Sequence, residues 1–211
     1  MKFENNKGIF YFLFAVVVIG SMVVYFKIER DKKLENPNLT DLATEPDLLM
    51  NTADRSFQDR KSLTSIKYLE DAIKMMRLLE KDGDSISTAA IEVAIYDLEV
   101  VESHIKDEDI NTDLMYEAFA DAMNSLAFAS LRVSEQFIRE GKEEEARITI
   151  NHAMDHLQNS ITFARGQQKE DEIRIAAHLQ RLIDNHLDGD ITQIDVVMAE
   201  IDSVVKAHVI Q

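Results

Sequence analysis

Residues 127–161 read AFASLRVSEQFIREGKEEEARITINHAMDHLQNSI, and this stretch decides the fold. On both sides of Gly141, apolar residues recur at intervals of three and four, which is the spacing of helices that bury one face. A glycine after such a run is typical of the left-handed residue that ends a helix. The stretch therefore predicts two long helices joined by a short turn, and so short a turn makes neighbouring helices antiparallel.

The same spacing continues in both directions along the chain. Glycine also follows a helical run at Gly83, Gly166 and Gly189, where we expect further left-handed helix ends. In chain order, the expected apolar stripes are Ile66, Leu69, Ile73, Met76 and Leu79; Ile91, Ala94, Leu98, Val101 and Ile105; Met115, Phe119, Ala122, Leu126, Ala129, Val133 and Phe137; Ile150, Ala153, Leu157, Ile161 and Ala164; Ile175, Leu179, Leu182 and His186; and Ile194, Val197, Ile201, Val204 and His208. The sequence thus predicts an all-α domain over residues 56–211, an antiparallel bundle or hairpin array of five or six helices.

The hairpins around Gly83 and Gly141 share a pattern of alanine and leucine, which indicates either an internal repeat or the usual composition of helical hairpins. Residues 127–161, about a sixth of the chain, resemble the paired helices of tetratricopeptide-type hairpins and of the bacterial YfdX-type proteins. The aromatic residue and the proline of the tetratricopeptide consensus are missing. A true internal repeat would imply stacked hairpins with a groove for a partner, whereas the resemblance to these families concerns the architecture of the hairpin alone.

Charge is distributed very unevenly along the chain. Of 23 Lys/Arg and 39 Asp/Glu residues, residues 1–33 carry six basic and three acidic side chains. Residues 34–211 carry the remaining 17 basic and 36 acidic side chains, a net charge of −19. Nucleic acid and anionic lipid headgroups repel such a domain, so basic protein surfaces or cations are the expected partners. The alternative is that the acidity only keeps the bundle soluble.

Several classes of chemistry are excluded by residues that the chain lacks. There is no cysteine, which excludes disulfides, thiolate metal sites and a cysteine nucleophile. The sequence has no glycine-rich phosphate loop, no G-x-S-x-G motif and no dinucleotide-binding fingerprint. We therefore expect a protein that is not an enzyme and that has no cofactor and no small-molecule substrate.

Residues 8–26 (GIFYFLFAVVVIGSMVVYF) contain no charged side chain. As a helix, a stretch of this length spans roughly 28 Å, close to the hydrocarbon thickness of a bilayer. It predicts a single transmembrane helix within an anchor over residues 1–35, with a basic juxtamembrane segment. Residues 36–55 are expected to form a tether with at most one short helix. The run is longer than the apolar core of a secretory signal, which favours an uncleaved anchor over a cleaved signal.

Two features of the sequence predict opposite orientations of this anchor. Four basic residues follow the apolar run and two lysines precede it, and the positive-inside rule alone would leave the domain in the cytoplasm. An anchor this close to a basic N-terminus usually exports the domain on its C-terminal side. We favour an extracytoplasmic domain, on the periplasmic or extracellular side.

His152 and His156 form the sharpest candidate site. Histidines four residues apart on a helix share a face and can bind one metal ion, with Met154 or Asp155 nearby. The glutamate of the HExxH protease motif does not follow the first histidine, so zinc proteolysis is not indicated. The alternative is that both histidines are packing and hydrogen-bonding residues beside the seam formed by Ala153 and Leu157.

Together these features predict a membrane-anchored, non-catalytic accessory or scaffold subunit. Its acidic helical domain would dock a protein partner in a membrane complex. One alternative is a metal- or haem-binding bundle that uses His152 and His156. Another is an exported stress-type helical protein with a cleaved signal.

Overall fold

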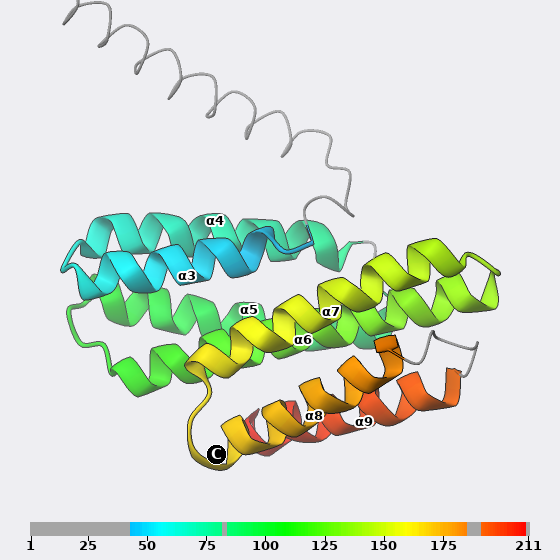
Figure 1. Cartoon of the computed structure of the whole chain (residues 1–211). Coiled ribbons are helices and arrows are strands. Elements are labelled where there is room, and N and C mark those ends of the chain that lie inside the picture. The colour runs from blue at the N-terminus through cyan, green and yellow to red at the C-terminus, as the bar shows by residue number, and fades with distance from the viewer. Residues whose placement is uncertain (1–42, 82–83, 185–190, 210–211) are drawn as a thin grey trace, which may run out of the picture. The chain divides into compact units, whose positions relative to one another are not determined.

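A computed structural model describes residues 43–81, 84–184 and 191–209 of the chain. These residues form seven helices and no strand, which confirms the all-α prediction. With the labels of Figure 1, the helices are α3 (Glu45–Gln58), α4 (Ser62–Glu80), α5 (Ser85–Lys106), α6 (Thr112–Arg139), α7 (Glu143–Phe163), α8 (Gly166–Asp184) and α9 (Ile191–Val209). The six expected helices correspond to α4–α9.

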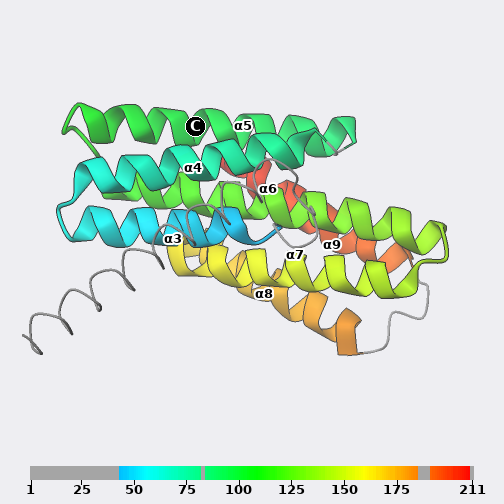
Figure 2. The same cartoon turned by 90° about the horizontal axis from the view of Figure 1, so that it is seen from above.

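Helix α6 lies at the centre of the bundle. Residues 118–127 are buried on every side of this helix, because α5, α7 and α9 all pack against it. Its most extensive partner is α7, which runs back beside it (Figures 1 and 2). Near the end of α7, the ring of Phe163 meets Phe119 of α6 edge to face, with 5.3 Å between ring centroids. The hairpin predicted around Gly141 is thus the core of the fold.

The predicted stripes face the interior over most of their length. Every residue of the stripe predicted for α5 is buried, and so is the α6 stripe as far as Leu126. Beyond that point α6 differs, because Ala129, Val133 and Phe137 are only half-buried. The fully buried apolar residues there are Ala127 and Leu131, on another side of the helix, where they belong to a core cluster with residues of α7, α8 and α9. The α8–α9 hairpin therefore determines which side of this half of α6 is buried.

Helix α3 includes the second half of the residues 36–55 that were expected to form a tether. Residues 45–55 belong to a helix that packs on α4, and its apolar residues Leu49, Met50 and Ala53 are buried. A proline and two acids in its first turn explain the start, because Pro fits the first turn of a helix and acids complement the macrodipole. Residues 45–55 thus belong to the helical unit that the structure describes.

Three helices end in the same hydrogen-bonded turn with a left-handed residue. After α6 this residue is Gly141 at φ 73°, as predicted, but after α3 it is Arg60 at φ 59° and after α5 it is Glu108 at φ 56°. In each turn the backbone N–H groups of the left-handed residue and of the residue after it donate to carbonyls near the end of the helix, as from Arg60 to Phe57 at 2.8 Å. Gly166, predicted to end α7, is instead the first residue of α8 at φ 51°, and α7 ends at Phe163. Gly83 and Gly189 lie outside the described residues.

Arg60→Gly is expected to raise the free energy of unfolding by about 0.5–1 kcal/mol, because glycine adopts the left-handed region without the clash of a Cβ atom. The gain is partly offset by the greater freedom of glycine in the unfolded chain. Urea denaturation measures it. The matched control is Gly141→Ala, where an added Cβ meets no atom within 4 Å, so that its expected loss of about 1 kcal/mol reports backbone strain alone. A loss of stability in Arg60→Gly would contradict the prediction.

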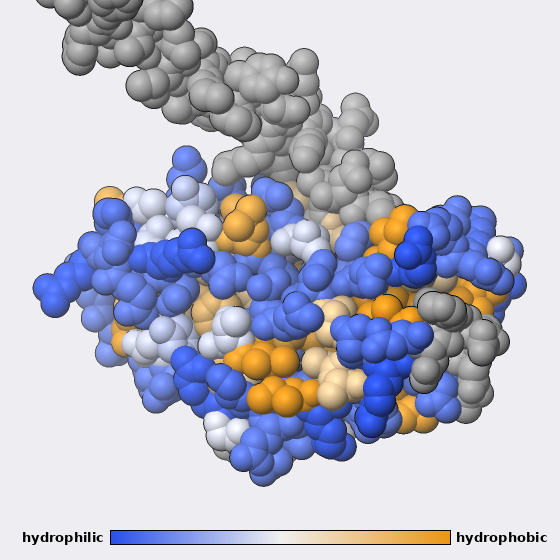
Figure 3. All heavy atoms as spheres, viewed as in Figure 1, coloured by the Kyte–Doolittle hydropathy of each residue, from blue (hydrophilic) through white to orange (hydrophobic). Residues whose placement is uncertain are grey.

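The predicted anchor cannot be compared with the structure, because residues 8–26 lie outside the described residues, as does all of 1–35. Among the helices that the structure does describe, none combines the length and apolar character needed to cross a membrane. On the face of the bundle shown in Figure 3, most of the described surface is hydrophilic and the hydrophobic areas are small and separate.

Candidate functional site

Asp47 of α3 and His156 of α7 form a buried polar contact between two helices far apart in the sequence. Each residue is only 1% exposed, and His156 Nδ1 lies 2.9 Å from both carboxylate oxygens of Asp47. Asn159, three residues further along α7 and thus on the same side of that helix, donates from Nδ2 to Asp47 Oδ2 at 2.9 Å. This arrangement fixes the first turn of α3 against the middle of α7.

The two predicted metal ligands, His152 and His156, lie in different environments. His156 is buried with its Nδ1 on Asp47, whereas His152 is half-buried one turn earlier on α7. Across residues 43–81, 84–184 and 191–209, no three His, Cys, Asp or Glu side chains gather in a way that could hold a metal ion. A histidine oriented by a carboxylate is common among metal ligands, but the same contact serves structural histidines. Metal binding by this pair stays a prediction.

A second buried group lies one turn further along α7, where Ser160 faces Glu172 of α8. Glu172 is 0% exposed, and its Oε1 accepts a hydrogen bond from Asn124 Nδ2 of α6 at 2.7 Å. Ser160 Oγ lies 2.9 Å from Glu172 Oε2 and 3.1 Å from the carbonyl oxygen of Ala120. One helical turn before Glu172, Gln168 donates to Asp121 of α6 at 3.0 Å. Three helices are thus joined by polar contacts inside the core.

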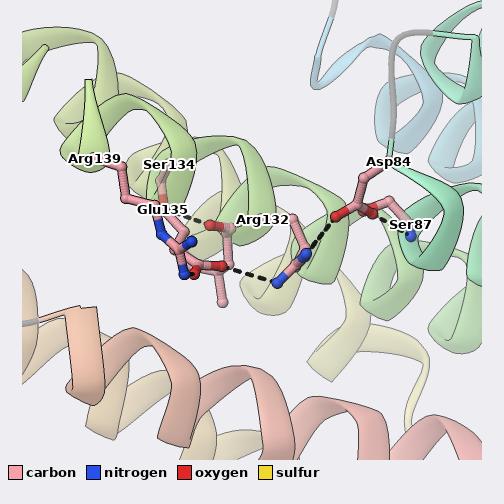
Figure 4. Close-up of polar contacts among 7 residues, drawn as sticks. Asp84, Ser87, Arg132, Ser134, Glu135 and Arg139 are labelled. Carbon is pink, nitrogen blue, oxygen red and sulfur yellow. Dashed lines mark hydrogen bonds and ion pairs between the residues drawn. The ribbon is translucent and has the colours of Figure 1, made fainter.

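A third polar network lies closer to the surface and joins the start of α5 to α6 (Figure 4). Asp84 caps α5 by accepting from the backbone N–H of Ser87 at 2.8 Å, and it also accepts from Arg132 Nε at 2.8 Å. Arg132 donates in turn to Glu135, a 4% exposed carboxylate that Arg139 contacts from the other side. Burial by itself raises the pKa of Asp84, but the hydrogen bonds from Ser87 and Arg132 outweigh it and hold that pKa below its ordinary value.

The surface of α5 carries a feature of a different kind. Ile86, Val93 and Tyr96 are 54%, 39% and 65% exposed, and Ala89 between them is exposed too. Figure 2 shows why: α5 lies at the edge of the bundle, with α4 beside it. Since α4 and α6 are the helices that pack extensively on α5, its side away from both stays uncovered. We call Ile86, Ala89, Val93 and Tyr96 the outer face of α5.

Two acids without a basic counterpart lie beside this outer face. Asp97 of α5 is half-buried, and burial together with the nearby charge of Glu117 on α6 raises its pKa. Neither Asp97 nor Glu117 forms an ion pair with a cation in the described part of the chain. On the other flank of the same face, Glu92 is exposed. The apolar face is therefore bordered by negative charge.

His152 and His156 stand out in the sequence, but the buried polar residues around His156 and Ser160 do not. Asp47 falls within the predicted tether, although Thr-Glu-Pro-Asp at residues 44–47 is a recognisable helix start. The local sequence does not show that Glu172 and Asn124 are buried, because a single polar residue in a helix can lie on either the buried or the exposed side.

Comparison of the chain with protein-family models, with curated proteins and with solved structures found no match in any of the three.

Proposed function

We propose that this protein is a membrane-anchored, non-catalytic accessory or scaffold subunit whose acidic helical domain docks a protein partner. The observation that carries the proposal is the outer face of α5, a row of exposed apolar side chains on a strongly charged domain. Contiguous apolar surface with a polar border is typical of sites where proteins interact. The uncharged residues 8–26 support the membrane part of the proposal.

The buried polar contacts fit a scaffold as well. Asp47, His156, Ser160 and Glu172 are all nearly inaccessible and bonded between helices. Such networks fix the relative positions of helices, because an unpaired buried polar group is costly. A rigid bundle can present a surface of constant shape to a partner, which is what docking requires.

The test is recovery of the tagged full-length chain from native membranes in a mild detergent. We expect it to sediment with membranes and to elute in a complex larger than the chain itself.

Val17→Arg, which puts a charge in the middle of the apolar run, should weaken membrane insertion by about 2.5–3.5 kcal/mol, and Val17→Leu should not.

Recovery of the chain alone and monomeric would count against the scaffold role. A native mass that lacks the N-terminal residues would instead favour the alternative of an exported helical protein with a cleaved signal.

A further inference from the structure

The outer face of α5 has the residue spacing of a helix–helix seam. Its members Ile86, Ala89, Val93 and Tyr96 follow one another at intervals of three, four and three residues, and the half-buried Val100 continues the series. This is the a/d pattern of a coiled coil, in which each side chain inserts between those of a facing helix. Helix α5 therefore carries two apolar stripes, one for the bundle core and one that nothing in the described structure covers.

The charges beside the seam select the occupant. In the same heptad register, the flanking e and g positions hold Asp97 on one side and Glu92 and Glu99 on the other. Only Glu99 has a cation within the described residues, Arg77 of α4 at 2.6 Å. Across a coiled coil these positions face the e and g residues of the partner helix. A partner with lysine or arginine there would neutralise the border, and the neighbouring Glu117 adds to its negative charge.

We propose that the outer face of α5 binds an amphipathic helix of another protein, one with an apolar stripe and basic flanks. This inference rests on the proposed docking function and names the surface and the chemistry of its partner. The partner helix lies along α5 with its apolar side chains between Ile86, Val93 and Tyr96. Its basic side chains reach Asp97 and Glu92.

A second copy of this chain fits the same face poorly. If two α5 helices paired in parallel, Glu92 of one would face Asp97 of the other, and an antiparallel pair would bring Asp97 near Asp97 and the glutamates near each other. Like charges at these positions are the usual means of excluding a wrong partner. Residues 34–211 of each copy also carry a net charge of −19, which adds long-range repulsion.

The experiment uses the full-length chain in a neutral detergent and two synthetic three-heptad peptides. Both peptides have leucine at a and d, and they differ in carrying lysine or glutamate at e and g. We expect saturable one-to-one binding of the lysine peptide in fluorescence anisotropy, at least tenfold tighter than of the glutamate peptide. The double variant Val93→Glu/Tyr96→Glu should weaken that binding at least tenfold. Ile173→Glu, at a 50% exposed apolar position on α8, is the matched control and should change it less than twofold.

The charge contribution has its own readout. In the double variant Glu92→Lys/Asp97→Lys, the preference should reverse, so that the glutamate peptide binds more tightly than the lysine peptide. Circular dichroism and the unfolding transition are measured for each variant, and we expect each to be folded because the changes are at exposed or half-buried sites.

Three results would overturn the inference. Binding of the lysine peptide that Val93→Glu/Tyr96→Glu does not change would mean general attraction to an acidic protein. Absence of binding, with the native chain dimeric and this variant monomeric, would identify a second copy as the occupant. A membrane complex that survives in this variant would leave the docking function intact and place it on another surface.

If the peptide results hold but the native chain is recovered alone from membranes, the scaffold role fails and the binding surface stands.

Discussion

His156→Leu is expected to lower the free energy of unfolding by about 3–5 kcal/mol, which is among the largest effects of any single substitution in this chain. The substitution leaves the Asp47 carboxylate, 1% exposed, with Asn159 as its remaining side-chain partner across the helices. Removal of one partner of a buried polar pair exposes the full desolvation cost of the other. Asp47→Leu should be costly for the same reason, because His156 Nδ1 loses both carboxylate contacts.

The double variant Asp47→Leu/His156→Leu separates this explanation from simple loss of packing. With both polar groups gone, nothing unsatisfied remains, and two leucines can pack between α3 and α7. We expect the double variant to lose at least about 2 kcal/mol less than the sum of the single losses. Urea unfolding followed by circular dichroism gives all four values of the cycle. Additive losses would show that the contact contributes no coupling.

His178→Leu is the matched control on α8. His178 Nδ1 lies 3.1 Å from Glu200 Oε2, a similar contact, but its side chain is 37% exposed and that of Glu200 is 22% exposed. Water can solvate either group after the other is removed, so the expected loss is about 1 kcal/mol or less. A loss as large as that of His156→Leu would mean that burial does not decide the cost.

The helices could be predicted because each one shows its buried side in its own sequence. The stripe from Ile91 to Ile105 faces the core of α5 along its whole length, as the spacing of apolar residues requires. The prediction was wrong where a distant element decides which side is buried. The half-buried Val133 and Phe137 of α6 fitted the stripe, but the α8–α9 hairpin packs on the side of Leu131 instead.

The candidate sites depend on contacts that no local pattern records. Asp47 and His156 lie 109 residues apart in the sequence, and they meet only because the folded bundle brings the start of α3 to α7. The left-handed ends at Arg60 and Glu108 were invisible for another reason, because neither residue type is one that such positions favour. The outer face of α5 was present in the sequence as a second apolar stripe, yet one buried stripe already accounted for a helix.

Glu172→Gln is expected to preserve the stability of the bundle, whereas Glu172→Ala should lower it by about 2–4 kcal/mol. The reason lies in a count of protons. Ser160 Oγ is within hydrogen-bond distance of two acceptors, the carbonyl oxygen of Ala120 at 3.1 Å and Glu172 Oε2 at 2.9 Å, but a hydroxyl has only one proton to donate. One of the two contacts lacks a proton unless the side chain at position 172 supplies it.

A glutamine at position 172 supplies that proton without a change of shape. Its Nε2 can donate to Ser160 Oγ, Ser160 can then donate to Ala120, and its Oε1 still accepts from Asn124 Nδ2. Alanine offers none of these groups. Because Asn124 Oδ1 already has no partner among the described residues, the whole buried amide would then be unsatisfied.

Urea denaturation at neutral pH compares the two variants with the native chain. A free energy of unfolding for Glu172→Gln within about 1 kcal/mol of the native value, or above it, would agree with the proton count. If Glu172→Gln lost as much stability as Glu172→Ala, the negative charge itself would be what the core requires at this position. The polar centre between α6, α7 and α8 would then be held by charge, and the hydroxyl of Ser160 would have to divide its one proton between two acceptors.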